Sequence, residues 1–235
     1  MQGEEGISIS IIVGAQDIVN PINTSLPADE KLQQLQELSQ QSQVYVRKFM
    51  DRIDAKYGTK SQDNFKKPER IIEKASRPSI RQNKPWFDVE HIRDAYRFKT
   101  VLKDMEILPQ LAQELKVEGF EIVKADIDKV LDPGQWGWRA VIIDLRLPNG
   151  QLVEYYLPVK EVEATKLTKG HKLYEKWRDR NPVDFTKAEE MEYFNDTELS
   201  YALYSKAWNA YLKRTSQSKT YIEAVLEEIA QILKA

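Results

Sequence analysis

Several residue types that build common protein sites are scarce or missing in this chain. None of its 235 residues is a cysteine, which excludes disulfides, thiolate zinc sites and a cysteine nucleophile and leaves the redox compartment open. Its only histidines are His91 and His171, so a zinc site would have to be built largely from carboxylates. The sequence therefore does not favour a zinc enzyme.

The chain also has no excess of one charge and no long apolar run. Lysine and arginine number 35 against 37 aspartate and glutamate residues, so no global positive field predicts wholesale binding of nucleic acid. The longest apolar run near the start, residues 7–13, contains serine and follows acidic residues rather than a basic region. It is also far shorter than the roughly 18 residues of a membrane span. We expect neither membrane insertion nor a signal peptide.

Apolar spacing predicts helices at both ends of the chain and a small sheet between them. Residues 28–57 read as one long amphipathic helix that Gly58 ends, with a break in its glutamine- and serine-rich middle left open. A short helix is expected over 68–77, and helices fill the chain from residue 159 onward. The order is that of an α+β domain in which N- and C-terminal helices flank the sheet. Strands are predicted over 91–102, 120–125, 138–147 and 152–157, with a helix over 106–116.

Two further segments have simple interpretations. Residues 1–27 contain glycine and proline with little periodicity, and we expect a loose leader or the junction where a domain was cut from a longer chain. In the C-terminal part, aromatic residues at helical spacing are expected to pack in the core. They are Tyr201, Tyr204, Trp208 and Tyr211.

A basic stretch covers residues 64–84. Arg70, Lys74 and Arg77 stand at helical spacing on one face, and Lys66 lies just before that helix. One interpretation is a solvated helix that pairs with its own glutamates. The other is a cradle for a polyphosphate, in which lysines act as point charges and arginines as bidentate forks.

Glu154 stands alone in an apolar, β-rich run. Asn149-Gly150 predicts a hairpin, and a two-residue turn would set Glu154 opposite Leu145 with Ile143 beside it. An ionised carboxylate would be costly there unless a cation, a donor or water meets it. A loop one residue longer would shift the register.

Asp94 is the second candidate acid. An aspartate at the start of a strand is commonly a turn or cap residue. Together with Glu154 on a neighbouring strand, however, it would offer the two carboxylates that Mg²⁺ takes beside substrate phosphates. Asp144 competes for either role.

Aromatic and histidine residues are candidates for binding a substrate. Trp138, after Gly137, is either an interior side chain or a surface on which a nucleobase stacks. His171 and Tyr174 share one face of a predicted helix, where His171 is either a packed or capping residue or a substrate contact.

Five short motifs, taken in order, resemble the synthetase domain of the RelA/SpoT family, the alarmone synthetases with a nucleotidyltransferase-like fold. The resemblance covers about residues 60–178 and implies a mixed sheet of nucleotidyltransferase type. It divides the chain into a leader or junction (1–27), an N-terminal helix (28–62), a synthetase core (63–180) and C-terminal helices that pack on the core (181–235). The motifs are N-F-K-K-P-E-R-I-I-E-K-A-S-R (64–77), D-A-Y-R-F-K (94–99), W-G-W-R (136–139), V-E-Y-Y (153–156) and G-H-K-L-Y (170–174).

The resemblance implies roles for the matched residues. Asp94 and Glu154 would be catalytic and would hold Mg²⁺ on the phosphates of ATP, and Glu154 would also take the proton of the acceptor's 3′-hydroxyl. The acceptor would meet Trp138, Arg139, Tyr156 and His171, with Trp138 stacked on its base. The ATP phosphates would meet Lys66, Arg70, Lys74, Arg77 and Lys99.

The chain departs from the family's motifs at six positions. Asn64 replaces an arginine, Arg70 a serine, Arg97 a glycine, Lys99 an arginine, Trp138 a tyrosine and Tyr156 a glutamine. Contacts to the donor triphosphate and the metal are largely kept, whereas acceptor contacts are altered. The His-Asp pair of the family's hydrolase domain is not found in the sequence. The resemblance is therefore to toxin-type members that have no hydrolase domain.

This resemblance implies Mg²⁺-dependent transfer of pyrophosphate from ATP to the 3′-hydroxyl of a purine nucleotide, giving (p)ppGpp- or (p)ppApp-type products. The chain would act as a growth-arresting toxin in the bacterial cytoplasm, delivered as the C-terminal domain of a secreted polymorphic protein or carried in a toxin–antitoxin pair. Its partners would be purine nucleotides and a neutralising immunity protein or antitoxin, with a homo-oligomer left open. Three alternatives stay open: the tRNA 3′ end as acceptor, an inactive nucleotide- or partner-binding module, and adenylyl transfer, which would release pyrophosphate instead of AMP.

Overall fold

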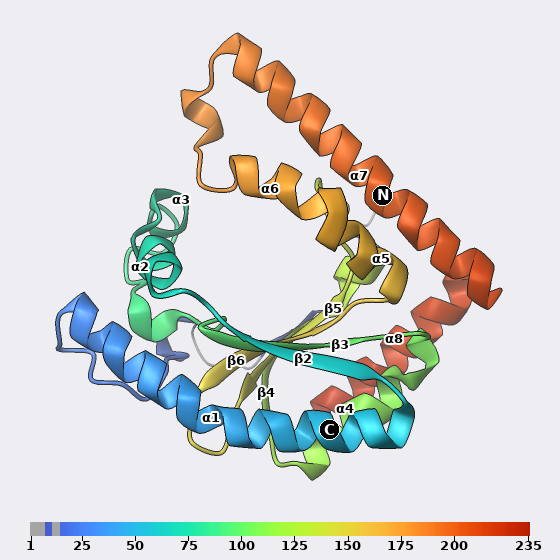
Figure 1. Ribbon diagram of the computed structural model, residues 1–235, viewed down its shortest axis with the longest axis horizontal. Coiled ribbons are helices and arrows are strands. Elements are labelled where there is room, and N and C mark those ends of the chain that lie inside the picture. The colour runs from blue at the N-terminus through green and yellow to red at the C-terminus, as the bar shows by residue number, and fades with distance from the viewer. Residues whose placement is uncertain (1–7, 11–14) are drawn as a thin grey trace.

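The computed structural model describes residues 8–10 and 15–235, in which helices flank a six-stranded mixed sheet (Figure 1). The strand order is β1-β4-β5-β6-β3-β2, and of the neighbouring pairs only β3 and β6 run parallel. This confirms the predicted α+β class with a mixed sheet. The strands are β1 (Ser8–Ser10), β2 (Lys60–Phe65), β3 (Tyr96–Val101), β4 (Glu121–Asp126), β5 (Val141–Arg146) and β6 (Leu152–Leu157).

The helices agree with the sequence pattern at most places. The predicted helix over 28–57 is present and runs without a break to Gly58, whose left-handed φ of 63° ends it.

Among the described residues, no helix is long and apolar enough to cross a membrane. The helices are α1 (Ala28–Tyr57), α2 (Pro68–Ser76), α3 (Pro78–Arg81), α4 (Leu108–Val117), α5 (Lys160–Thr165), α6 (His171–Trp177), α7 (Lys187–Thr215) and α8 (Lys219–Lys234), and a π-helical turn (Lys166–Gly170) joins α5 to α6.

One face of the sheet forms the main core. Helix α1 lays Phe49 against Phe98 of β3 and Tyr155 of β6, and those two strand residues stack at 4.2 Å between ring centroids. Because side chains alternate along a strand, the residues next to them, Arg97 and Glu154, point to the opposite face. The sheet is therefore apolar toward α1 and polar on its other side.

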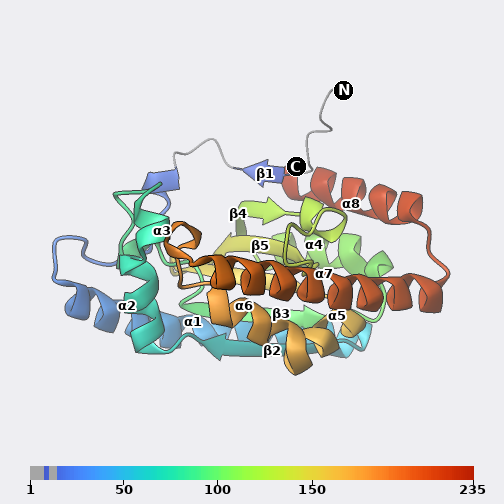
Figure 2. The same cartoon turned by 90° about the horizontal axis from the view of Figure 1, so that it is seen from above.

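Helices α5, α6 and α7 stand over the polar side, and α7 crosses above the sheet (Figure 2). The prediction that its aromatic residues pack in the core is confirmed for Tyr204, Trp208 and Tyr211. It is wrong for Tyr201, which is 41% exposed.

A second, smaller core fixes the position of α2 at one end of the sheet. Ile71 and Ala75 of α2 are buried against Leu35 of α1 and Ile92. The apolar stripe of α2 is used in this contact, so its basic stripe faces away from α1, toward the polar side of the sheet. Figure 1 shows α2 and α3 at the side of the sheet, apart from α6 and α7.

The predicted register of the β5–β6 hairpin is wrong by one residue. Glu154 pairs with Asp144, not with Leu145. A shift of one residue moves a side chain to the other face of a sheet. Glu154 therefore lies on the polar face, and the apolar surroundings expected for it belong to Val153 instead.

Pro148 explains the shift. A two-residue turn at Asn149-Gly150 would need an N–H group at position 148 to close the pair with Gln151, and proline has none. Instead the N–H of Leu147 donates to the carbonyl of Gln151 at 2.9 Å. This leaves a three-residue loop whose last member, Gly150, has a φ of 85°.

Two predicted strands begin later than expected. Strand β3 starts at Tyr96, so Asp94 lies before the strand and not within it. Strand β5 starts at Val141, so Trp138 lies in the loop before it. Gly137, with a φ of 77°, closes a turn immediately before Trp138, and its N–H donates to the carbonyl of Gly134 at 3.1 Å.

The described part of residues 1–27 is more ordered than a loose leader. Strand β1 pairs with β4, and Asn20, which is 1% exposed, donates to the carbonyls of Glu90 and Ile92 and accepts from the N–H of Leu152. The sequence did not predict this contact, because one buried side-chain amide that forms three hydrogen bonds to the backbone leaves no periodic signal. Residues 1–7 and 11–14, which include most of the apolar run noted above, lie outside the described residues.

Gly137 and Gly134 lie in one loop and allow a matched test of this packing. Both have positive φ, so alanine costs about 1–2 kcal/mol of backbone strain at either position. At Gly137 a Cβ atom would also lie 2.7 Å from the Cα of Tyr201, whereas at Gly134 it would meet nothing within 4 Å. We expect Gly137→Ala to lower the free energy of unfolding clearly more than Gly134→Ala, as measured by chemical denaturation. Equal losses would contradict the close approach of the loop to α7.

Candidate active site

A cavity of about 780 Å³ opens on the polar face of the sheet, between α2–α3 and α6–α7. This is in the upper part of the range of roughly 300–1,000 Å³ found for small-molecule sites. Ten lysine and arginine side chains line it against four aspartate and glutamate side chains, although the whole chain carries a net charge of −2. The cavity concentrates positive charge that the composition does not reveal, and such a field attracts polyanions.

Strand pairing places a row of four charged residues across the floor of the cavity. Lys124 of β4 pairs with Asp144 of β5, Asp144 with Glu154 of β6, and Glu154 with Arg97 of β3. The two central members are both acidic and are direct cross-strand neighbours. The row therefore has two carboxylates at its centre and one cation at each end.

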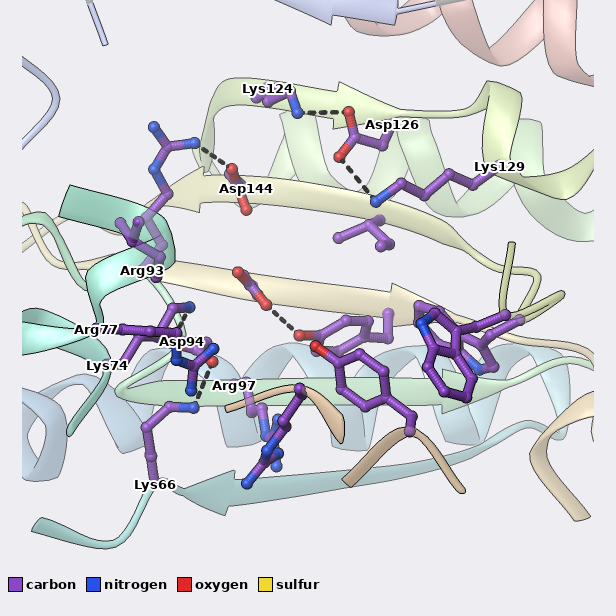
Figure 3. Close-up of a pocket in the computed structure, with 18 of the residues that line it drawn as sticks. Lys66, Lys74, Arg77, Arg93, Asp94, Arg97, Lys124, Asp126, Lys129 and Asp144 are labelled. Carbon is purple, nitrogen blue, oxygen red and sulfur yellow. Dashed lines mark hydrogen bonds and ion pairs between the residues drawn. The ribbon is translucent and has the colours of Figure 1, made fainter. Parts of the chain in front are cut away.

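Asp94 lies at the edge of this floor, held between two lysines (Figure 3). Its carboxylate is 2.6 Å from Lys66 Nζ and 2.8 Å from Lys74 Nζ. Burial alone would raise the pKa of Asp94, but the two ammonium groups overcome this and lower the pKa to about 2. Asp94 is thus ionised at any physiological pH. Burial would lower the pKa of Lys74, but Asp94 and then Glu154 raise it above its ordinary value.

Glu154 has the opposite electrostatic environment. Burial, followed by the negative charge of Asp94, raises the pKa of Glu154 to about 7, although Lys74 acts in the other direction. The hydroxyl of Tyr156 donates a hydrogen bond to its carboxylate. A carboxyl group with this pKa exchanges a proton near neutral pH, as a general base must.

Lys66 and Lys74 form a cationic wall of the cavity, and Arg77 extends this wall along the basic face of α2. The Nη2 atom of Arg77 lies 2.8 Å from both Glu73 and Asp179, the latter just after α6. Its Nε atom is buried and has no hydrogen-bond partner in the protein. Arg77 therefore keeps a free donor near the cavity that a ligand oxygen could fill.

Aromatic side chains form the wall on the other side of Glu154. The rings of Trp138 and Tyr156 meet edge to face at 5.8 Å, and the Lys166 ammonium lies 5.2 Å from the Trp138 ring centroid. The indole Nε1 atom of Trp138 is buried without a hydrogen-bond partner. Burial lowers the pKa of Lys166, and Arg97 adds to this effect. This wall can hold a planar group and donate to it.

His171 lines the cavity from the first turn of α6. Its ring stacks on that of Tyr174 at 6.1 Å, and burial lowers its pKa. The preceding Gly170 is needed because a Cβ atom there would lie 2.5 Å from the buried ring of Tyr204. Gly170 thus lets α6 approach α7 and brings His171 to the cavity.

The structure brings eight of the eleven predicted site residues to one cavity: Lys66, Lys74, Arg77, Asp94, Trp138, Glu154, Tyr156 and His171. The other three are not among its lining residues. Arg70 pairs with Glu73, and Lys99 pairs with Glu163 of α5.

Arg139 has a structural place instead of the predicted substrate contact. Its guanidinium is buried, donates to the carbonyls of Val130 and Leu131, and lies 5.5 Å from the ring centroid of Trp208. It holds the loop before β5 against α7. The sequence motif does not distinguish this role from a substrate contact. The partners of Arg139 are backbone carbonyls, and their positions depend on the conformation of the folded loop.

Sequence reasoning missed several basic residues of the cavity. Lys124 and Asp126 could have been found, because they alternate with the apolar Val123 and Ala125 along β4 and so share its polar face. Arg97 lies on β3, and the others come from loops, turns and helix ends with no local signal. The missed basic residues are Lys84, Arg93, Arg97, Lys124, Lys129, Lys166 and Arg178.

Asp94 and Glu154 are the residues best suited to a metal. Among the described residues, no group of three histidine, cysteine or acidic side chains could hold a metal ion. Mg²⁺ needs less than this from a protein, because one or two carboxylates suffice when substrate phosphates supply further oxygens. The repulsion between Asp94 and Glu154, which raises the pKa of Glu154, is what a divalent cation would relieve. The donor chemistry therefore fits Mg²⁺.

Comparison with solved structures identifies the fold. No protein-family model and no curated protein matches the sequence. The type VI effector Tas1, crystallised with its immunity protein, matches with a TM-score of 0.51 at 17% identity, over 80% of this chain and 100% of that chain. The small alarmone synthetase 2 from Bacillus subtilis matches with a TM-score of 0.50 at 19% identity, over 77% and 96% of the two chains.

These likenesses show that the chain has the fold of the RelA/SpoT-type synthetase domain. The resemblance drawn from the five motifs is thereby confirmed at the level of the fold.

The opposite environments of the two acids make a pH-dependent prediction for stability. Because the folded-state pKa of Glu154 is about 7, above its ordinary 4.5, its ionisation destabilises the fold as pH rises through this window. Glu154→Gln removes the charge. Without metal, we expect this variant to melt at a higher temperature than the wild type at pH 8, with a much smaller gain at pH 5. A variant that melts lower at pH 8 would contradict the assignment.

Asp94→Asn provides the contrast. Because the folded-state pKa of Asp94 is about 2, below its ordinary 3.8, its stabilising effect is complete above pH 3.8 and is lost only as pH falls through 2. We expect Asp94→Asn to melt below the wild type at both pH 5 and pH 8. A gain at pH 8, like that of Glu154→Gln, would show that Lys66 and Lys74 do not pair with Asp94 in solution.

Proposed function

We propose that this protein is a Mg²⁺-dependent nucleotide 3′-pyrophosphokinase. It would transfer pyrophosphate from ATP to the 3′-hydroxyl of a purine nucleotide and give (p)ppGpp- or (p)ppApp-type products. The observation that carries the proposal is the pair Asp94 and Glu154 beside a strongly cationic wall, in a cavity of a RelA/SpoT-type fold. Transfer of phosphoryl groups depends mainly on positioning and on stabilising negative charge, and this arrangement supplies both.

The ATP phosphates are assigned to the wall that α2 and the end of β2 form. Lys66 and Lys74 would contact them as point charges, and Arg77 as a fork whose Nε donor is still unused. These cations would stabilise the charge on the migrating pyrophosphoryl group and on the departing AMP.

Asp94 and Glu154 are assigned to the metal. When bound, Mg²⁺ would neutralise phosphate charge and orient the phosphate chain. As the phosphates engage Lys66 and Lys74, Asp94 loses its two counter-ions and becomes available as a ligand. This exchange would couple donor binding to metal binding.

Glu154 is assigned as the general base. Its carboxylate would accept the proton of the acceptor's 3′-hydroxyl while that oxygen forms a bond to the β-phosphorus of ATP. The bond from the β-phosphorus to the oxygen bridging to the α-phosphorus breaks, and AMP leaves with that oxygen. The hydrogen bond from Tyr156 orients the carboxylate. A positioned base of this kind contributes about 10²- to 10⁴-fold to the rate.

The acceptor base is assigned to the aromatic wall. Trp138 would stack on it, with the unpaired indole N–H free to donate to the nucleotide, while Tyr156 and His171 complete the contact surface. Lys166 now covers part of the Trp138 ring and would move aside or contact the base edge.

A growth-arresting role in the bacterial cytoplasm is part of the proposal. One structural neighbour, Tas1, is a type VI effector crystallised with its immunity protein, which supports secretion and neutralisation by a dedicated partner. Expression in bacteria without such a partner should therefore stop growth, and Glu154→Ala should restore it. Arrest by the variant at equal protein level would contradict the role of Glu154.

The direct test uses purified protein, Mg²⁺ and γ-labelled ATP, with GDP, GTP, ADP, ATP or bulk tRNA offered separately. We expect label on a purine nucleotide, release of AMP, and a loss of at least about 10²-fold in Glu154→Gln. Glu121→Gln, at the exposed first residue of β4 and outside the cavity, is the matched control and should keep full activity. Label on tRNA alone would change the acceptor, release of pyrophosphate would indicate adenylyl transfer, and no transfer despite ATP binding would indicate an inactive binding module.

A further inference from the structure

One buried side-chain amide joins two segments that lie far apart in the sequence. Asn20, which is 1% exposed, donates through Nδ2 to the carbonyls of Glu90 and Ile92 at 3.0 and 2.8 Å. Its Oδ1 atom accepts from the N–H of Leu152 at 2.9 Å. The amide thus ties the 3₁₀ turn that precedes β3 to the first residue of β6.

Both ends of this bridge lie two residues before a proposed metal ligand. Ile92 precedes Asp94, and Leu152 precedes Glu154. The parallel ladder between β3 and β6 begins at the pair that includes Glu154 and runs away from Asp94. The amide of Asn20 therefore joins the two segments on the side of Asp94, where the ladder does not reach.

The segment around Asn20 is itself anchored. Ile18 is buried with Leu152 and Val123 in a small cluster, and the backbone N–H of Asn20 donates to the carbonyl of Glu90 at 2.7 Å. N–H···O distances in proteins vary only over about 2.7–3.2 Å. An anchored amide with such bonds on both sides fixes the separation of the two segments that it joins.

The turn that leads to Asp94 is also held from its other side. Lys31 of α1, which is 5% exposed, lies 2.8 Å from Asp88 and 3.0 Å from Glu90. The 3₁₀ turn Val89–His91 is therefore fixed between α1 and the buried amide. Because the turn is rigid, a position set at its end is passed on to Asp94.

The chemistry of the bridge requires an amide. Its hydrogen bonds use two donors and one acceptor, and the side chain of Asn20 carries this set at the right length. Aspartate would place a carboxylate against two carbonyl oxygens, and glutamine is one methylene longer. Alanine would leave the carbonyl of Ile92 and the N–H of Leu152 without these partners, so the two segments would no longer be tied.

We propose that Asn20 is a positioning residue that sets the separation of Asp94 and Glu154 for the divalent cation that these two acids would share. This inference rests on the proposed pyrophosphokinase, in which both acids bind Mg²⁺. Mg²⁺ demands near-ideal octahedral geometry, so its affinity depends on how well the carboxylates are placed. Loss of a supporting group outside the ligand set typically lowers metal affinity by about 10- to 100-fold.

The test measures how much Mg²⁺ tightens the binding of a non-hydrolysable ATP analogue, by calorimetry in Mg²⁺ and in EDTA. We expect Asn20→Ala to weaken binding in Mg²⁺ by about tenfold. In EDTA its binding should stay within about twofold of the wild type, because Asn20 does not contact the cations assigned to the phosphates.

Tyr211→Phe is the matched control. The buried hydroxyl of Tyr211 accepts from the N–H of Met105 and donates to Gln217, and all three residues lie outside the cavity. Its removal also costs a buried hydrogen bond to the backbone, but it should change neither measurement.

A double-variant cycle separates positioning from a general loss of stability. In Glu154→Gln protein one of the two ligands is gone, so adding Asn20→Ala should weaken binding in Mg²⁺ by less than about twofold. A general loss of stability would lower binding in both backgrounds. Asn20→Ser keeps a small polar group and should fall between the wild type and Asn20→Ala, and it replaces the alanine variant if that does not fold.

Three results would overturn the inference. They are unchanged binding in Mg²⁺ by folded Asn20→Ala, equal losses in Mg²⁺ and EDTA, and equal losses in the two backgrounds. A wild type whose analogue binding does not respond to Mg²⁺ would overturn it together with the metal assignment. The expected binding pattern in a wild type that transfers no pyrophosphate would uphold the role of Asn20 and refute the pyrophosphokinase.

Discussion

The site depends on the placement of Asp94 between Lys66 and Lys74. Asp94 precedes β3, Lys66 follows β2 and Lys74 lies on α2, so this one buried carboxylate joins three segments at the edge of the sheet. A buried charge is stable only when it is paired, and breaking the pair on one side would leave uncompensated charge in the cavity wall. In the proposed function the same arrangement would prepare the chemistry, because phosphates that took the lysines would release an ionised carboxylate next to Glu154. The contact of Asp94 with the two lysines thus stabilises the fold when no ligand is bound, and its release by phosphates would be the first step of the proposed function.

The two acids differ because their neighbours differ, although both are largely shielded from water. Asp94 has two ammonium groups at hydrogen-bonding distance and keeps its charge, whereas Glu154 faces Asp94 and Asp144 and holds a proton more easily. Two acids with separated pKa values can have different chemical roles. One stays ionised at all working pH values, and the other can accept a proton near neutral pH. The register of the sheet produces this difference, since it places Glu154 beside Asp144 and on the face away from α1. A near-neutral chain thereby obtains a cavity that suits polyanions.

Local signals in the sequence predicted much of the fold and only part of the site. The long helix, the short basic helix and the strand Leu152–Leu157 follow from periodicity and from proline and glycine positions. The hairpin register was missed because it depends on the missing N–H of Pro148. Arg97 lies beside Glu154 because β3 pairs with β6, a strand far away in the sequence, and no local pattern encodes this pairing. The alternation along β4 places Lys124 on the polar face, but its position beside Asp144 follows only from strand pairing. The convergence of Asp94, Glu154 and the α2 cations was anticipated by family resemblance, and the same resemblance misplaced Arg139, whose partners are backbone carbonyls of a folded loop.

A crystal structure with Mg²⁺ and a non-hydrolysable ATP analogue would test the central claim most directly. The account predicts that the phosphate chain contacts Lys66, Lys74 and Arg77, and that Asp94 has left both lysines to bind the metal together with Glu154. A phosphate chain bound elsewhere, with the contacts of Asp94 to Lys66 and Lys74 unchanged, would contradict it. In that case the lysines would be structural partners of Asp94 and nothing more.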